Sequence, residues 1–329
     1  MRTNHEVAEA SDWPTLDVIV VNWNTGDQLR TCLASLTNAR HDAFYIGNVF
    51  VVDNASSDGS ANGLDELDLP LTVLRNKENR GFAAACNQAA AASRSRYILF
   101  LNPDTRVTTD SILRPVEFLE KPGNGRVGIV GIQLLNDQGT VSLTCARFLT
   151  AGMILRKMIG LDYVPPFLWT PHFMVDWDHK TTRQVDHVMG AFFLVRNHLF
   201  QELGGFDERF FVYLEDLDFS LRAKAAGFET FYLAGATAYH KGGGATAQVK
   251  ATSLYYALAS RILYGYKHFG RGVGTLLAIG TLFFEPFSRV AVAIARRSPS
   301  QVRDTLKAYS LLWRALPRGL VVTGSPDAI

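Results

Sequence analysis

Apolar runs that end in polar residues alternate with helix-like segments through the first third of the chain. The runs 16-LDVIVVNWN-24, 48-NVFVVDNASSDGS-60 and 97-YILFLNPDT-105 have the continuous apolar character of buried parallel strands. Between them, 26-GDQLRTCLASLTNAR-40 and 81-GFAAACNQAAAAS-93 carry apolar or small residues at helical spacing. This alternation, with its short links, predicts an α/β fold with a Rossmann-like, mostly parallel central sheet.

Three of these runs end in residues that can bind ligands. Asn22, Asp53 and Asp104 each follow a predicted strand. Ligands of open α/β sheets bind outside the carboxyl ends of the strands, so a site is expected where these residues gather. Strand ends also need polar turn residues, and an Asn-Pro-Asp turn or a helix cap would explain each residue taken alone.

An acidic cluster follows an aromatic run in 211-FVYLEDLDFSLRAKAAGF-228. Glu215 and Asp216 stand at the predicted start of a helix that ends at Gly227. Acids in a first turn suit the helix dipole, which accounts for one of them. A carboxylate beside an apolar wall is also a stronger general base, because lost hydration raises its pKa. Asp216 is therefore a candidate base, and Asp218 is expected to be a solvated or capping residue.

The C-terminal part of the chain is basic and apolar. Residues 251–329 hold ten Lys or Arg and three Asp or Glu. The whole chain is nearly balanced, with 33 Lys or Arg and 31 Asp or Glu. The apolar segment 273–284 is shorter than the roughly 20 residues of a membrane-spanning helix, and Glu285 and Pro286 interrupt it before 290-VAVAIA-295. Two short apolar segments with flanking Arg predict a helical hairpin lying in a membrane interface. The alternative is a packed pair of C-terminal helices.

These patterns divide the chain into three parts. Residues 1–15 are expected to form a flexible lead-in, residues 16–245 an α/β domain, and residues 246–329 a helical extension. The three cysteines have no metal-like spacing, and such sparse usage indicates a reducing compartment, so a cytoplasmic location is expected.

Taken in order, the motifs resemble those of glycosyltransferase family 2, and within it the rhamnosyltransferase-like branch of bacterial cell-surface polysaccharide synthesis. The segments that carry the resemblance are VIVVNWNT, VVDNASSDGS, NRGFAAACN, FLNPDT, VMGAFFLVR and GGFDERFFVYLEDLDFSLRAKAAGF, followed by a histidine. They cover roughly residues 16–245. The resemblance implies a GT-A fold and an inverting transfer of a sugar from a nucleotide-sugar with a divalent metal, Mn²⁺ or Mg²⁺.

The resemblance also implies residue roles. Asp216 would deprotonate the acceptor hydroxyl, and Glu215 would orient either Asp216 or the acceptor. Asp104 and His240 would hold the metal. The donor would be bound by Asn22, Asp53, Asn79, Gly81, Asn87, Asn102 and Asp104. The sugar or acceptor pocket would include Gly190, Ala191, Asp207 and Tyr213, although Asp207 is also expected to order its own loop.

One motif departs from many members of the family. Relatives often carry two acids flanking one residue at the metal motif, whereas this chain has Asn102-Pro103-Asp104, a pattern common in the rhamnosyltransferase-like branch. Metal dependence therefore stays open. The implied donor is dTDP-rhamnose, with UDP-hexoses or UDP-galactofuranose as alternatives, and the implied acceptor is a polyprenyl-diphosphate-linked saccharide at the inner face of the cell membrane. A nucleotide-sugar-binding homologue without catalysis, or a nucleotidyltransferase, would be the competing classes.

Overall fold

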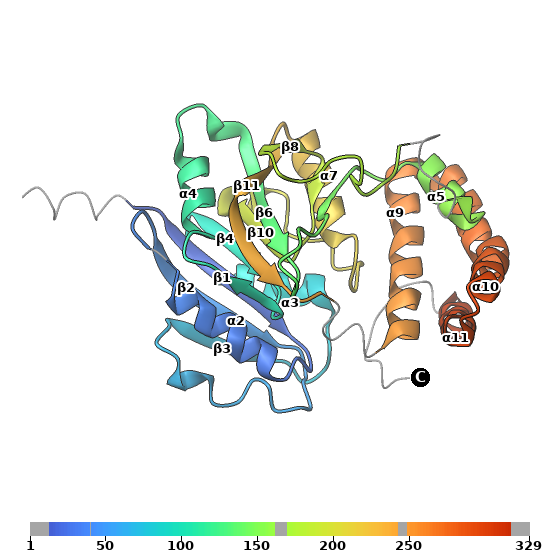
Figure 1. The fold of residues 1–329 in the computed structure, drawn as a ribbon, viewed down its shortest axis with the longest axis horizontal. Helices are drawn as coiled ribbons and strands as arrows, with labels where there is room; N and C mark the ends of the chain where they lie inside the picture. The colour runs from blue at the N-terminus through green and yellow to red at the C-terminus, as the bar shows by residue number, and fades with distance from the viewer. Residues whose placement is uncertain (1–12, 40, 162–169, 243–248, 317–329) are drawn as a thin grey trace, which may run out of the picture.

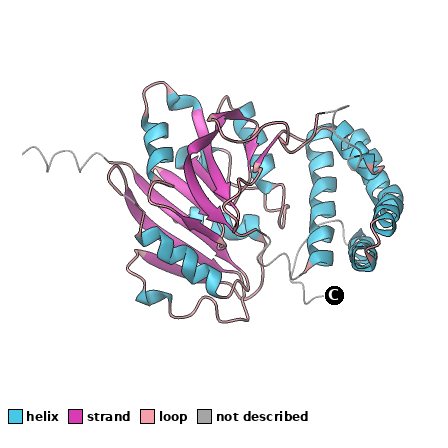
Figure 2. Ribbon diagram, viewed as in Figure 1, coloured by secondary structure: helices cyan, strands magenta, loops and turns pink. Residues whose placement is uncertain are grey.

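The computed structural model describes residues 13–39, 41–161, 170–242 and 249–316 (Figure 1). Within them, nine strands form a central sheet with helices on its faces (Figure 2). The order across the sheet is β3 (Leu71–Arg75), β2 (Tyr45–Asp53), β1 (Thr15–Asn22), β4 (Tyr97–Leu101), β10 (Phe192–Arg196), β6 (Val127–Leu135), β11 (Glu229–His240) and β5 (Thr105–Val107), and β8 (Arg183–Val185) pairs with β11. The predicted α/β class and mostly parallel sheet are confirmed.

The register of the parallel strands aligns the polar residues at their ends. Strands β1 to β4 are mutually parallel, and Asn22 lies directly opposite Asp53. Strand β10 runs antiparallel between β4 and β6, and it places the turn at Gly190 and Ala191 beside the end of β4. Segments far apart in sequence therefore meet at one edge of the sheet, as the position of a ligand site in such folds requires.

Alternate residues of each central strand enter one of two apolar cores. Leu16, Val18 and Val20 of β1 pack toward helix α2 (Asp27–Thr37). Ile19 and Val21 face the other side, where helix α3 (Phe82–Ala90) lies. Helices α4 (Leu113–Glu120), α6 (Asn197–Glu202) and α7 (Glu215–Ala225) complete the layers. Burial on both faces explains why these strands have no alternation of apolar and polar residues.

The C-terminal helices form a bundle against the domain. They are α9 (Lys250–Ile279), the π-helical turn η6 (Gly280–Phe284), α10 (Glu285–Ala295) and α11 (Pro299–Ala315), and helix α5 (Ala151–Met158) packs beside them. The chain reverses within α9 at Gly270, whose φ is 78°. Backbone in this left-handed region favours glycine.

The predicted break between two apolar segments at Glu285 and Pro286 is wrong. The backbone stays helical through both residues. Glu285 is fully buried and pairs with Arg261 and Arg289, because a carboxylate inside a helical bundle needs partners of opposite charge. The hairpin of this region turns at Gly270 instead.

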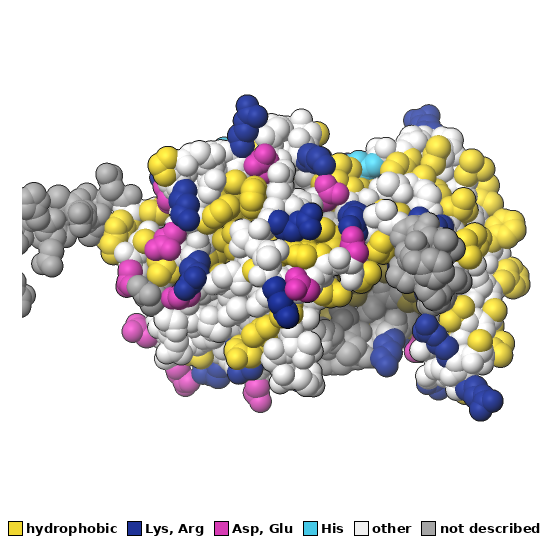
Figure 3. Space-filling view, turned by 45° about the horizontal axis from the view of Figure 1, so that its top comes forward, with side chains coloured by type: hydrophobic (Ala, Val, Ile, Leu, Met, Phe, Trp, Pro, Cys, Tyr) yellow, Lys and Arg dark blue, Asp and Glu magenta, His cyan; other side chains and the backbone are white. Residues whose placement is uncertain are grey.

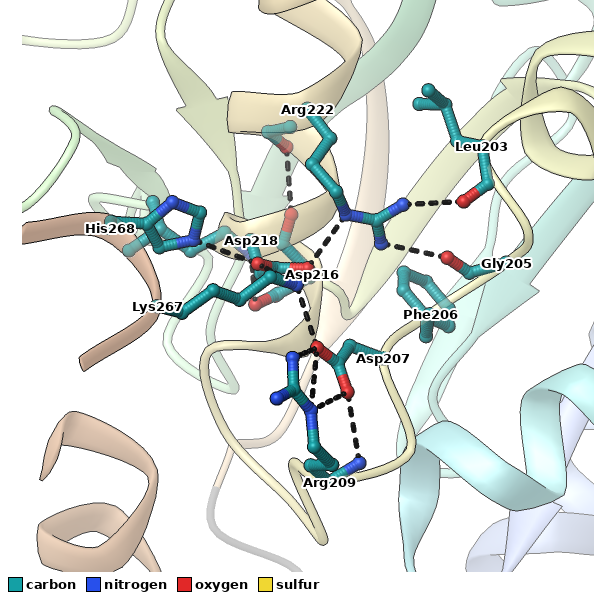
Figure 4. A network of polar contacts seen from close by, with 12 residues as sticks. Leu203, Gly205, Phe206, Asp207, Arg209, Asp216, Asp218, Arg222, Lys267 and His268 are labelled. Atoms are coloured by element: carbon teal, nitrogen blue, oxygen red, sulfur yellow. Dashed lines mark hydrogen bonds and ion pairs between the residues drawn. The ribbon is translucent and has the colours of Figure 1, made fainter. Parts of the chain in front are cut away.

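Helix α9 is fixed to α7 by a buried network of charges (Figure 4). The Asp218 carboxylate lies 2.6 Å from Lys267 Nζ, 2.8 Å from His268 Nε2 and 2.9 Å from Arg222 Nε. Lys267 also lies 2.7 Å from Asp207. The expectation that Asp218 is a solvated or capping residue is therefore wrong, since its side chain is buried among these partners and makes no capping hydrogen bond.

The network keeps the Asp218 carboxylate ionised. Burial alone would raise the pKa of Asp218, but hydrogen bonds from His268 and Lys267 and the charge of Arg222 outweigh it and lower the pKa below its ordinary value. Asp207 follows the same pattern, because hydrogen bonds from Arg209 and Lys267 outweigh burial and lower its pKa. These contacts place the first turn of α7 relative to α9.

Replacing Asp218 by Asn should destabilise the fold by about 3 kcal/mol, since it leaves Lys267 and Arg222 without their buried counter-charge. The measurement is urea unfolding at neutral pH, with the exposed Glu66→Gln as control and an expected change under about 0.5 kcal/mol. A group whose pKa is lowered by folding stabilises above its unfolded pKa and loses that contribution as pH falls through the folded pKa. The wild type should therefore lose more stability on acidification than Asp218→Asn, and equal pH dependence would contradict the ion-pair account.

Candidate active site

A cavity of about 500 Å³ opens beside the carboxyl ends of β1 and β4. Its wall is assembled from the β1–α2 turn, the start of α3, the turn after β4, the segment before β10, the start of α7 and the first turn of α9. The predicted site residues that line it are Asn79, Gly81, Asn102, Asp104, Gly190, Ala191, Tyr213, Glu215, Asp216 and His240. Residues as far apart in sequence as 79 and 240 thus share one cavity.

Asn22 and Asp53 lie behind the cavity wall and brace its loops. The Asn22 amide nitrogen is 3.1 Å from Asp53 Oδ1 and 3.0 Å from the Ser56 hydroxyl. The second oxygen of Asp53 is 3.4 Å from Arg75. Both side chains are buried, so in this structure they hold the 54–60 loop and do not line the cavity.

Asn54 lines the cavity and was missed from sequence, although it directly follows Asp53. Its amide donates to Asn79 Oδ1 at 2.9 Å, and its oxygen accepts from the Arg80 main-chain N–H at 3.1 Å. It thereby clamps the loop that ends at Gly81. Gly81 has a φ of 86°, and a Cβ there would lie 2.5 Å from the Phe211 main-chain oxygen. Only glycine fits this approach.

Asp104 and His240 meet at the cavity although 136 positions of sequence separate them. His240, the last residue of β11, pairs with Thr105 of β5, and this register puts its Nε2 3.2 Å from Asp104 Oδ1. An oxygen and an imidazole nitrogen suit Mn²⁺. No third His, Cys, Asp or Glu joins them among the described residues. The pair therefore fits a divalent ion whose remaining ligands would come from a diphosphate and water.

Two strained residues aim the acidic pair at the start of α7. Tyr213 and Leu214 have φ values of 71° and 68°. Such backbone is costly for residues with a Cβ and concentrates at functional sites. Asp216 Oδ2 then accepts the Gly190 N–H at 2.8 Å, and Oδ1 accepts the Leu217 N–H at 2.8 Å. Both carboxylate oxygens are thus held by main-chain donors.

Glu215 is buried in a different environment. Its Oε2 has no hydrogen-bond partner among the described atoms. Burial, and next the charge of Asp216, raise the pKa of Glu215 well above its ordinary value. The two neighbouring carboxyl groups therefore lie in different environments. Glu215 favours the neutral form, whereas the carboxylate of Asp216 is held by hydrogen bonds.

Two histidines and helix α9 complete the wall and were not predicted. His187 and His172 both line the cavity. Burial, and next the charge of His187, lower the pKa of His172 to about 4. From α9, Thr252, Ser253 and Tyr256 reach the cavity. Tyr256 stacks on Phe211 with ring centroids 4.5 Å apart, so the C-terminal region is part of the site.

Two further predicted residues, Asn87 and Asp207, do not line the cavity either. Asn87 Nδ2 donates to the Phe206 carbonyl at 2.8 Å, and its Oδ1 accepts the Phe206 N–H at 2.9 Å. It lines a separate shallow depression with Gly205 and Glu208. Asp207 is engaged by Arg209 at 2.6 Å and by Lys267. Both residues order the 205–209 loop, as was expected of Asp207 alone.

Known proteins resemble this chain in sequence. The N-acetylglucosaminyl-diphospho-decaprenol L-rhamnosyltransferase of Mycobacterium tuberculosis is 26% identical over 253 residues, which cover 73% of this chain and 80% of the relative. The rhamnosyltransferase WbbL of Escherichia coli is 29% identical over 149 residues, which cover 44% of this chain and 52% of the relative.

Solved structures resemble it in fold. The mannosyltransferase PcManGT from Pyrobaculum calidifontis, in complex with GDP-Man and Mn²⁺, superposes with a TM-score of 0.53 at 18% identity, covering 95% of this chain and 82% of that chain. GalNAc-T7 with UDP, GalNAc and Mn²⁺ gives the same score at 14% identity, covering 88% of this chain and 59% of that chain. At such identities the likeness bears on the fold, and it confirms the predicted GT-A architecture.

The family model described as glycosyl transferase family 2 matches residues 17–204, more than half of the 329-residue chain. This match spans the segments that build most of the cavity, from the end of β1 to the turn at Gly190. The chain belongs to glycosyl transferase family 2, and it is a glycosyltransferase.

Proposed function

We propose that this enzyme transfers L-rhamnose from dTDP-rhamnose to a hydroxyl of a polyprenyl-diphosphate-linked saccharide in cell-envelope polysaccharide synthesis. The observation that carries the reaction type is one cavity holding both the Asp104–His240 pair and the carboxylate of Asp216. The choice of rhamnose rests on the two rhamnosyltransferase relatives. A UDP-hexose or UDP-galactofuranose donor would use the same cavity and is the alternative.

An inverting transfer is a single in-line displacement at the anomeric carbon. It needs a base for the acceptor hydroxyl and a means of stabilising the departing nucleoside diphosphate. Asp216 is the proposed base, because two main-chain N–H groups orient its carboxylate within the cavity. Gly190 leaves room for the incoming hydroxyl, since a Cβ at this position would lie 3.0 Å from Asp216 Oδ2.

Asp104 and His240 are the proposed ligands of the divalent ion. A bound Mn²⁺ or Mg²⁺ would neutralise the charge that develops on the diphosphate. Asn54, Asn79 and Gly81 also line the cavity, and Asn54 is hydrogen-bonded to Asn79 there. We assign the donor to this side and the acceptor to the side of Asp216 and α9.

Asp216→Asn should keep donor binding and lower the transfer rate by about a hundredfold or more, because it removes the base while its amide oxygen can still accept one of the two main-chain N–H groups. Radiolabelled sugar transfer would measure the rate, and a thermal-shift titration would measure donor binding. Asp110→Asn, on the surface at the start of α4, is the control and should transfer normally. Near-normal transfer by Asp216→Asn would refute the assignment of the base.

Asp104→Asn should weaken metal-dependent donor binding about tenfold or more, since it removes one of two protein ligands. The measurement is the thermal shift caused by dTDP-rhamnose, UDP-glucose, UDP-galactose or GDP-mannose, each with Mn²⁺ and with a chelator. The wild type should respond to one nucleotide and require the ion. A variant that retains the full Mn²⁺-dependent shift would exclude Asp104 as a ligand.

The far end of the C-terminal bundle is the proposed membrane contact. Large apolar side chains are exposed there at helical spacing, including Leu276 at 70%, Phe284 at 65%, Phe287 at 76% and Ile294 at 64%. Figure 3 shows hydrophobic side chains gathered at this end of the molecule. Helix α5 adds Leu155 and Ile159, which are also exposed. Monomers rarely expose such a contiguous surface without a partner.

The same surface favours lying on a membrane over crossing it. The helical stretch Lys250–Ala295 is long and apolar enough to span a bilayer by length and composition. However, it reverses at Gly270, and it carries the buried Arg261–Glu285 pair. Arg296 and Arg297 follow the apolar stripe and suit anionic headgroups. We therefore place the enzyme peripherally on the cytoplasmic face of the cell membrane.

The double variant Phe283→Ser/Phe287→Ser should bind vesicles of phosphatidylglycerol and phosphatidylcholine about tenfold or more weakly, because both rings would leave the apolar interface. Vesicle co-sedimentation measures this. Tyr45→Ser, an exposed aromatic residue on β2, serves as the control and should bind as the wild type does. Unchanged sedimentation of the double variant would rule this surface out as the membrane contact.

A further inference from the structure

His187 is a buried histidine beside the proposed base. It begins the short strand β9 (His187–Val188), which pairs with β7 (Cys145–Ala146) and so fixes its position. Its side chain is only 5% exposed, and its Nε2 lies 3.6 Å from Asp216 Oδ2. The histidine also lines the cavity. No role assigned so far uses this contact.

The contacts of Ser220 favour the Nδ1–H tautomer of His187. The Ser220 hydroxyl donates its single hydrogen to the main-chain oxygen of Asp216 at 2.9 Å, one helical turn earlier. The same hydroxyl oxygen lies 3.0 Å from His187 Nδ1, and with its hydrogen used it accepts there. With this assignment His187 carries its proton on Nδ1, and Nε2 presents a lone pair toward Asp216.

In the resting enzyme, two acceptors thus face each other across 3.6 Å. A carboxylate oxygen and an unprotonated imidazole nitrogen form no hydrogen bond until a proton arrives between them. Catalytic hydrogen bonds are often this long before the substrate binds, and they shorten during the reaction. In this tautomer the gap can receive the proton that the base removes.

We propose that His187 Nε2 accepts, from Asp216, the proton of the acceptor hydroxyl, so that the two residues act as a relay. This inference rests on the proposed function. In the step, the acceptor oxygen forms a bond to the anomeric carbon while the bond from that carbon to the diphosphate oxygen breaks. The hydroxyl proton passes to Asp216 Oδ2 and then to Nε2. The nucleoside diphosphate leaves with the bonding electron pair, and the imidazolium returns its proton to water between turnovers.

The surroundings of His187 suit an acceptor that is neutral at rest. Burial lowers the pKa of His187, while the charges of Asp216 and next Asp186 oppose this effect. Asp186 itself pairs with Lys224 at 2.9 Å. His172 also faces this group, and with its pKa lowered to about 4 it adds no positive charge at neutral pH. The charges of Asp216 and Asp186 would both stabilise a transient imidazolium at His187.

The test is the single-turnover transfer rate of His187→Asn, with Ser220→Ala as a second variant. Asn can still donate from the position of Nδ1 to Ser220, but it has no nitrogen that can take a proton from Asp216. We expect its transfer rate to fall about tenfold to a hundredfold with an unchanged KM for the donor. Ser220→Ala frees the tautomer, so the ring can donate from Nε2 to Asp216 and no longer accept, and the rate should also fall.

The pH profile separates a relay from mere positioning. In the wild type, acid protonates His187 and blocks its acceptance, so the acid limb should lie at higher pH than in His187→Asn. His198→Gln, on the surface of α6, is the control and should match the wild type. A normal rate in His187→Asn, a reduced rate with an unmoved acid limb, or an unaffected Ser220→Ala would each overturn the relay. Failure of the wild type to transfer any sugar would instead overturn the proposed function.

Discussion

The buried carboxylate of Asp218 joins the two parts of the chain, and the geometry of the cavity depends on it. It stands in the first turn of α7, two residues after Asp216, and contacts Lys267 and His268 of α9. Lys267 in turn holds Asp207 on the preceding loop. An unpaired charge in this position would be strongly destabilising, so α7, α9 and the loop are fixed together. The same α9 contributes Thr252 and Tyr256 to the cavity wall, so the C-terminal helices are structural partners of the catalytic domain.

Close main-chain approaches set other parts of the cavity wall. The Gly81 loop touches the Phe211 carbonyl, and the Gly190 turn donates to Asp216. Both glycines stand where a Cβ would crowd its neighbour. Tyr213 and Leu214 connect these contacts in left-handed backbone. The strain at these residues is held by the surrounding ion pairs and strands, which is how a folded chain keeps a site in a conformation that its local sequence disfavours.

Local patterns predicted the sheet, and ten of the fourteen site residues that the family resemblance implies line the cavity, while long-range pairing was not predictable. The family resemblance, carried by the order of the motifs, was enough to assign Asp104, Gly190, Asp216 and His240 to one site. The Asp218–Lys267 pair joins residues 49 positions apart and leaves no periodic signal. Contacts between distant residues also explain two further differences. Asn87 and Asp207 were predicted to line the pocket, but they order a loop, and His187 was not predicted. The turn of the hairpin was expected near Glu285, because a charged residue between two apolar segments looks like a break between helices when its buried partner is not known.

In the proposed reaction, the cavity is the active site of an inverting transfer with Asp216 on the acceptor side. The most direct test is the anomeric configuration of the product, measured by NMR after reaction of the purified enzyme with a nucleotide-sugar and a short-chain polyprenyl-diphosphate saccharide. An inverted anomeric centre relative to the donor is predicted, since one displacement with a single base gives inversion. A product with retained configuration would contradict the account, as would hydrolysis of the donor without a glycosylated acceptor.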